Sequence, residues 1–169
     1  MLSQMNVRPA SCEDIDSIIE LDPIAKQEPG RRAFITSAVA AGQCWVAVEA
    51  EDASALIGYG VLNKSFFEHD FIPLIVVKVL ARRRGVATAI MRTLEEQCSG
   101  KLFTSTNTSN IAMRQLLKRL GFVESGQIEN LDDNDPELVF VKLPTGLSSP
   151  SPSPSPSLSS PFFLHRNGT

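Results

Sequence analysis

The segment Val76–Met91, VVKVLARRRGVATAIM, is the part of the sequence that most constrains the fold. A β-branched run ends there at three consecutive arginines, and after a glycine the apolar residues recur at helical spacing. A strand that passes directly into a helix leaves the first backbone N–H groups of the helix without partners, at the positive end of the helix dipole. Gly85 and Ala87 would let a ligand approach this backbone, and the arginines at 82–84 add positive charge. The segment therefore predicts an anion site suited to a diphosphate, with a solvated arginine cluster as the alternative.

Two glycine motifs of nucleotide-binding proteins are absent from the chain. It contains no GxxxxGK[ST] sequence, so hydrolysis of a nucleotide triphosphate is not indicated. Gly58 and Gly60 have the GxG spacing, but they lie inside an expected strand and not between a strand and a helix, where a dinucleotide would need them. The predicted anion site is therefore of neither kind.

Strand and helix patterns alternate along residues 5–143 and predict a single α+β domain. Runs of β-branched and aromatic residues predict strands, and apolar residues three and four positions apart predict helices. The expected strands span residues 5–10, 43–50, 55–67, 70–77, 101–107, 122–130 and 136–143, and the expected helices span 13–22, 30–41, 86–99 and 110–120. Pro73 interrupts the apolar run 70–77. Because proline cannot donate a backbone hydrogen bond, it predicts a sheet edge or a bulge there.

Charge and cysteine content exclude several classes of protein. The net charge is −3, which argues against a general nucleic-acid-binding surface. Cys12, Cys44 and Cys98 are odd in number and have no metal-ligand spacing, so we expect neither a disulfide framework nor a metal site. No apolar run is long enough to cross a membrane, and the first residues lack the core of a signal peptide. These features predict a cytoplasmic protein with no membrane partner.

The composition changes abruptly after Pro144, where serine and proline begin to alternate. Proline removes amide donors and serine contributes nothing to a core, so residues 145–169 are expected to be a disordered tail. We therefore predict one folded domain at residues 1–144. The tail has three possible roles: a linker, a docking peptide or a non-native extension.

The hexad from Arg82 to Ala87 fits the pattern [QR]-x-x-G-x-[GA], and its surroundings fit the same family in order. On these residues the chain resembles the GNAT superfamily of N-acetyltransferases. NVRPASCEDIDSIIELD is similar to the opening strand and helix of the family, FIPLIVV to its central strand, and NIAMRQLLKRLGF to its second motif. The resemblance covers residues 5–143. It implies a mixed, mostly antiparallel, twisted sheet flanked by about four helices, with a splayed central strand pair that binds the arm of coenzyme A.

The resemblance also implies acetyl-CoA as cosubstrate and assigns residues to it. The pantetheine arm would bind the backbone of Val76 and Val77. The diphosphate would be held by Arg82, Arg83, Arg84, Gly85, Val86, Ala87 and Thr88. Asn110 matches a family position that contacts the cofactor arm or a catalytic water. Its alternative role is a helix cap, and the two roles can coexist.

The catalytic groups are harder to place from the sequence. Acetyl transfer needs a base for the amine and often an acid for the departing thiolate. Family members commonly carry a tyrosine as the acid where this chain has Leu117, and the fifth-strand position that carries a carboxylate in some relatives looks like Ser105. We predict Glu68 and His69, at the turn into the central strand, as candidate bases. A solvated hairpin turn is the alternative.

The resemblance implies transfer of an acetyl group from acetyl-CoA to a primary amine of a small molecule or protein, by direct attack in a ternary complex. One alternative is a catalytically silent acyl-CoA-binding module, which Leu117 favours. Another is a non-enzymatic interaction protein that docks a partner through its tail. The acidic loop at 129–137 would either attract a cationic acceptor or be merely solvated. A monomer and a homodimer are both open.

Overall fold

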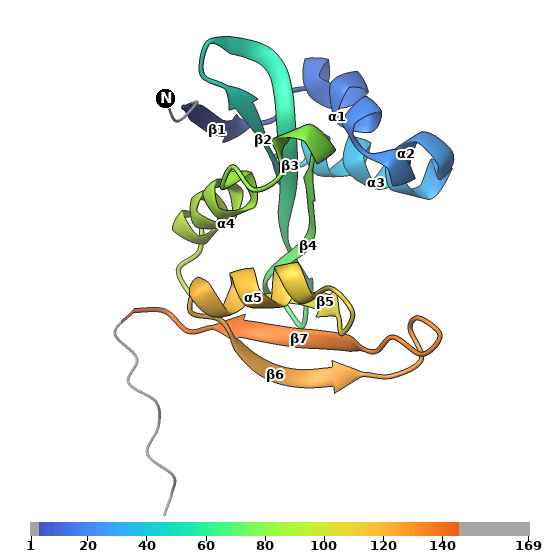
Figure 1. Cartoon of the computed structure of the whole chain (residues 1–169), viewed down its shortest axis with the longest axis vertical. Helices are drawn as coiled ribbons and strands as arrows, with labels where there is room; N and C mark the ends of the chain where they lie inside the picture. Colours follow the sequence, from blue (N-terminus) through green and yellow to red (C-terminus); the bar gives the residue numbers. More distant parts are fainter. Residues whose placement is uncertain (1–3, 146–169) are drawn as a thin grey trace, which may run out of the picture.

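A single twisted sheet forms the frame of the protein, in the strand order β1-β2-β3-β4-β5-β7-β6 (Figure 1). The structure is a computed structural model and describes residues 4–145. The strands are β1 (Met5–Pro9), β2 (Cys44–Glu49), β3 (Asp52–Phe66), β4 (His69–Val77), β5 (Leu102–Asn107), β6 (Val123–Ile128) and β7 (Glu137–Lys142). All neighbouring pairs are antiparallel except β4 and β5, which are parallel. The α+β class and the mixed, mostly antiparallel sheet agree with the prediction.

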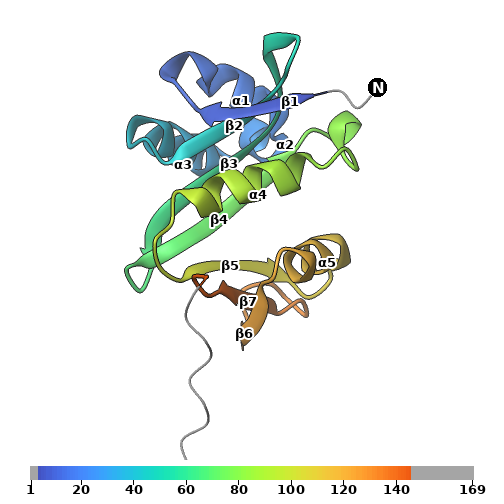
Figure 2. The ribbon, with the colours of Figure 1, turned by 90° about the vertical axis from the view of Figure 1, so that its left-hand side faces the viewer.

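Helices cover both faces of the sheet and enclose two apolar clusters. The α-helices are α1 (Ile15–Leu21), α2 (Pro23–Gln27), α3 (Pro29–Ala40), α4 (Val86–Glu96) and α5 (Ile111–Arg119), with 3-10 turns at Cys12–Asp14 and Val79–Ala81. One cluster lies under α4 and α5 and contains Ile90, Leu117 and Phe140. The other lies under α1–α3 and contains Ile18 and Tyr59. Figures 1 and 2 show α4 and α1–α3 on opposite sides of β2–β4.

Helix α2 was not predicted from the sequence. We expected one helix to end at Asp22–Pro23 and no helix to begin there. The structure begins α2 there, with Pro23 in the first helical turn, where the missing N–H of proline costs nothing. The Asp22 side chain caps the helix, and its Oδ1 accepts hydrogen bonds from the backbone N–H groups of Ile24 at 2.9 Å and Ala25 at 3.3 Å. The same dipeptide that ends one helix therefore starts the next.

Pro73 lies in a bulge of β4, which is one of the two outcomes that the sequence predicted. Val61 of β3 pairs with Leu74, whereas Asn63 pairs with Phe71, so β4 has one extra residue between these pairs. Ile72 and Ile75 consequently join the same apolar cluster although they are three positions apart. A bulge at this point increases the local twist of the strand and absorbs the missing proline donor.

Two glycines of β3 allow α4 to pack closely on the sheet. A Cβ atom on Gly60 would lie 2.6 Å from Cγ2 of Ile90 and 3.2 Å from Cδ1 of Leu94. A Cβ atom on Gly58 would lie 3.0 Å from Cγ1 of Val86, the first residue of α4. The GxG spacing in the sequence therefore seats α4, and with it the N-terminus of that helix, directly on β3.

Most of the predicted tail lies outside the described residues, which end at Thr145. Between residues 4 and 145, no helix is both long and apolar enough to cross a bilayer.

Replacing Gly60 with alanine should lower the free energy of unfolding by about 1–3 kcal/mol, because the β-branched Ile90 side chain cannot move away without strain. Urea unfolding followed by circular dichroism measures this change. Gly100→Ala is the matched control, since a Cβ atom there would have no neighbour within 4 Å. Equal midpoints for the Gly60 variant and the parent protein would contradict the close packing of α4 on β3.

Candidate functional site

The sheet opens between its two central strands, β4 and β5. Their parallel pairing is confined to Asp70–Ile72 opposite Leu102–Thr104, and the Thr104 hydroxyl fastens its end by donating to the carbonyl of Ile72 at 2.9 Å. Beyond that point β4 continues to Val77 along β3 only. Figure 2 shows β5 diverging from β4 along this stretch. The C-terminal half of β4 therefore has one edge that β5 does not cover.

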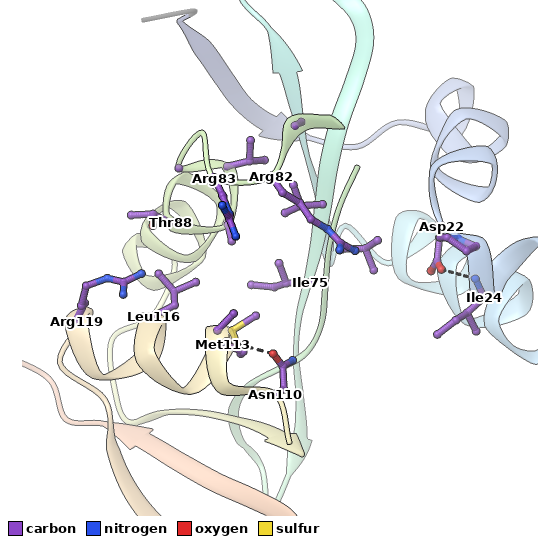
Figure 3. Close-up of a pocket in the computed structure, with 18 residues that line it drawn as sticks. Asp22, Ile24, Ile75, Arg82, Arg83, Thr88, Asn110, Met113, Leu116 and Arg119 are labelled. Carbon is purple, nitrogen blue, oxygen red and sulfur yellow. Dashed lines mark hydrogen bonds between the residues drawn. The ribbon is translucent and has the colours of Figure 1, made fainter. Parts of the chain in front are cut away.

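A pocket of about 730 Å³ lies at this opening (Figure 3). Its wall is built from four parts: Ile75–Val77 of β4, the 81–88 segment, one side of α5, and the α1–α2 junction at 22–24. Because α1 and α2 cover one face of the sheet and α4 and α5 the other, the pocket has walls on both faces. The gap is therefore bordered by side chains from both faces of the sheet.

The N-terminus of α4 forms one wall of the pocket and has no side-chain cap. Gly85 occupies the cap position with φ 81°, in the left-handed region that favours glycine, and a Cβ atom there would meet nothing within 4 Å. The first N–H groups of a helix have no intrahelical acceptor. Those of Val86–Thr88 therefore adjoin open space beside the pocket, where an anion would complete their hydrogen bonds.

The arginines of the strand-to-helix junction divide between two roles. Arg82 and Arg83 line the pocket, and neither pairs with a carboxylate among residues 4–145. Arg84 does not line it. Its guanidinium makes a bidentate ion pair with Glu49 of β2 at 2.7 and 2.8 Å, which raises the pKa of Arg84. Two of the three predicted charges therefore face the pocket, and the third fastens the junction to the sheet.

Comparisons with known proteins agree with this geometry. The family model described as "Acetyltransferase (GNAT) family" matches residues 13–122. The crystal structure of a GNAT-family acetyltransferase from Bacillus cereus has 32% sequence identity and a TM-score of 0.76, over 83% of this chain and 98% of that one. The chain belongs to the GNAT family of acetyltransferases.

Two more distant structures share the fold of this acetyltransferase. Ard1 from Thermoplasma volcanium has 21% identity and a TM-score of 0.69, over 83% of this chain and 97% of that one. NAA60 from Arabidopsis thaliana, in complex with acetyl-CoA, has 17% identity and a TM-score of 0.68, over 83% of this chain and 98% of that one. A comparison with curated protein sequences finds no significant match. The predicted GNAT fold is thus confirmed.

The structure brings together nine of the ten residues predicted to bind the cofactor of this acetyltransferase. They are Val76, Val77, Arg82, Arg83, Gly85, Val86, Ala87, Thr88 and Asn110, and Arg84 is the exception. Sequence reasoning missed the α1–α2 junction and the pocket face of α5, which includes Ala112, Leu116 and Arg119. The spacing of these three positions, four and then three, is that of one helix face, so the helical period could have indicated it.

Asn110 acts as a helix cap, as one of its two predicted roles requires. Its side-chain oxygen accepts from the backbone N–H of Met113 at 3.2 Å while the residue lines the pocket.

The acidic β6–β7 loop holds the residues before Asn110 in place. Asp135 accepts hydrogen bonds from the backbone N–H and the hydroxyl of Ser109 at 3.0 and 2.6 Å, and Asp132 accepts one from the Asn107 side chain at 2.8 Å. Two carboxylates of this loop therefore have structural partners.

The predicted catalytic residues lie away from the pocket. Phe67 and Glu68 form the β3–β4 turn, both with positive φ, and His69 packs its ring against Phe103 with the centroids 5.4 Å apart. Ile75, the first β4 residue of the pocket wall, lies six positions beyond His69, which corresponds to about 20 Å of strand. The structure does not bring Glu68 or His69 to the gap, and their catalytic role remains a prediction without geometric support.

Leu117 and Tyr59 are buried in the apolar core. Leu117, which replaces the usual tyrosine, is 1% exposed and packs from α5 into the cluster that contains Ile90 and Phe140. The buried hydroxyl of Tyr59 donates to Oδ2 of Asp22 at 2.6 Å, and burial together with this carboxylate raises the pKa of Tyr59 far above its usual value. Tyr59 therefore stays protonated. It fixes Asp22, which is 1% exposed and forms part of the pocket wall, with Arg31 3.4 Å from the same carboxylate oxygen.

Replacing Tyr59 with phenylalanine should lower the free energy of unfolding by about 1–3 kcal/mol, because it removes a donor from a buried carboxylate. Chemical denaturation at neutral pH measures the change. Ser54→Ala is the control, since it deletes a hydroxyl that donates to an exposed carboxylate, Asp52, and should leave the midpoint where it is. If the two variants have equal midpoints, Tyr59 does not hold the α1–α2 junction through Asp22.

Proposed function

We propose that this protein transfers the acetyl group of acetyl-CoA to a primary amine of a small molecule or protein, by direct attack of the amine in a ternary complex. The observation that carries the proposal is the gap between β4 and β5, which joins one free strand edge to the uncapped N-terminus of α4 in one pocket. A volume of about 730 Å³ is in the range that binds organic ligands of this size. NAA60 also appears among the related structures with a bisubstrate analogue.

The chain offers matching groups for two parts of coenzyme A, the pantetheine arm and the diphosphate. The edge of β4 at Val76 and Val77 has free hydrogen-bonding positions that an extended amide-containing arm can use like an added strand. The N-terminal amides of α4 suit the diphosphate, with Arg82 and Arg83 supplying the opposite charge. Asn110 stands on the other side of the gap. The Arg84 side chain is instead paired with Glu49 and lies outside the pocket wall.

The amine would reach the thioester from the face that carries α1 and α2. The titratable side chains in the pocket wall are Asp22, Arg82, Arg83 and Arg119. Asp22 already accepts four protein hydrogen bonds, and an arginine cannot act as a base at neutral pH. We therefore propose that water takes the proton from the amine and that the thiolate of coenzyme A leaves without a dedicated acid at position 117.

The chemistry of the pocket wall favours a second candidate function, a catalytically silent module that binds acyl-CoA. The described residues of the pocket wall include no free base or acid, so they supply binding chemistry without a group for proton transfer. The two functions differ in turnover, since a silent module binds acetyl-CoA and releases no coenzyme A with any amine.

Calorimetry with acetyl-CoA, followed by a thiol-release assay over a panel of amines, tests the proposal. We expect binding and amine-dependent release. Arg83→Gln should weaken acetyl-CoA binding about tenfold through loss of a charge-assisted contact. Arg92→Gln is the matched control, because this exposed arginine of α4 does not line the pocket. Binding without release would show the silent module, and no binding would exclude both functions.

The turn at Glu68 provides a separate test of the predicted bases. Given their distance from the pocket, Glu68→Gln and His69→Ala should retain release rates within about twofold of the parent. In a separate measurement, urea unfolding, Glu68→Gly should raise the free energy of unfolding by about 1 kcal/mol, because glycine adopts φ 63° without strain. A large loss of rate in both Glu68→Gln and His69→Ala, with folding intact, would restore the catalytic assignment.

A further inference from the structure

The pocket carries positive charge that no ion pair within residues 4–145 neutralises. Three arginines line its wall: Arg82, Arg83 and Arg119. None of them pairs with a carboxylate within residues 4–145. Among the described residues of the wall, Asp22 alone carries a carboxylate, and Tyr59 and Arg31 already engage it. The arrangement therefore fits a ligand with several negative charges.

Arg119 lies apart from the other two arginines. It comes from the last turn of α5, whereas Arg82 and Arg83 precede α4. Figure 3 shows it at the end of the pocket remote from Asp22, with its guanidinium directed towards Leu116 and the α4 wall that carries Thr88. The neighbouring Lys118 is equally close to the end of α5 but does not line the pocket. The favourable position of a cation at a helix C-terminus therefore does not explain why Arg119 faces this space.

We propose that Arg119 binds the 3′-phosphate on the ribose of coenzyme A and makes the pocket select this form over 3′-dephospho-CoA. The inference rests on the proposed function. In coenzyme A the ribose follows the diphosphate on the side opposite to the pantetheine arm. With the arm along Ile75–Val77 and the diphosphate at the N-terminus of α4, the ribose phosphate lies at the end of the pocket that Arg119 occupies.

Arginine suits this group in both charge and geometry. A phosphate monoester carries a charge of about −1.5 to −2 at neutral pH. The planar guanidinium can present two parallel N–H donors to two of its oxygens. The diphosphate already has the amides of α4 and two arginines nearby, so the monoester is the anionic group of the ligand that still needs a cation.

Calorimetric titrations of the full chain with coenzyme A and with 3′-dephospho-CoA test the inference. We expect the parent protein to prefer coenzyme A by about tenfold or more, as a charge-assisted pair predicts. Arg119→Gln should abolish this preference by weakening coenzyme A alone, and should leave 3′-dephospho-CoA within about twofold of its parent affinity. Lys118→Gln is the matched control and should change neither affinity, because its side chain lies outside the pocket wall. Thermal unfolding of each variant checks that the fold is intact.

The remaining outcomes separate this inference from the function on which it rests. If Arg119→Gln weakens both ligands equally, Arg119 contacts the diphosphate or the adenine, and the inference is overturned. If the variant weakens neither ligand, Arg119 is a solvated helix-end cation, and the inference is overturned as well. If the parent protein binds neither ligand, the proposed function fails and the inference fails with it.

Discussion

The arrangement of the site depends on the early end of the parallel pairing between β4 and β5. Three residue pairs join these strands, and the Thr104 hydroxyl closes the last of them on the carbonyl of Ile72. The next residue of β4, Pro73, has no N–H to continue a ladder and lies in a bulge that turns the strand. The sheet therefore stays continuous at one end and open at the other. The open edge provides backbone donors and acceptors in the interior of a folded domain without exposing them at an outer edge of the sheet.

A second constraint brings the helix N-terminus to this edge. The absence of side chains at Gly58 and Gly60 lets α4 lie directly on β3, beside the strand that lines the gap. The ion pair between Arg84 and Glu49 fastens the turn before α4 to β2 on the same sheet. The positive end of the α4 dipole is consequently held at the exit of β4 before any ligand arrives. Such prior ordering lowers the entropy that binding would otherwise cost.

Sequence patterns could predict the pocket wall formed by the start of α4 and not the wall formed by the α1–α2 junction. The arginine junction is a local feature in which the end of β4, a 3-10 turn, the arginines, Gly85 and the start of α4 follow one another between residues 77 and 86, so segment 82–88 could be placed without tertiary information. The short helix α2 could not, because Asp22–Pro23 suits both the end of one helix and the start of another. Glu68 and His69 looked close to the gap because they precede the central strand. They lie at the start of β4, however, whereas the gap opens only after Ile72, where the pairing with β5 ends. Glu68 and His69 therefore lie at the far end of the strand from the pocket.

The account is tested most directly by hydrogen exchange of individual backbone amides, measured by NMR on the full chain with and without coenzyme A. It predicts slower exchange at Val86–Thr88 and altered amide shifts along Ile75–Val77, because the first amides of α4 have no intrahelical acceptor and Ile75–Val77 lie beyond the part of β4 that pairs with β5. Saturating coenzyme A that leaves both segments unchanged, or that protects another part of the molecule instead, would contradict it.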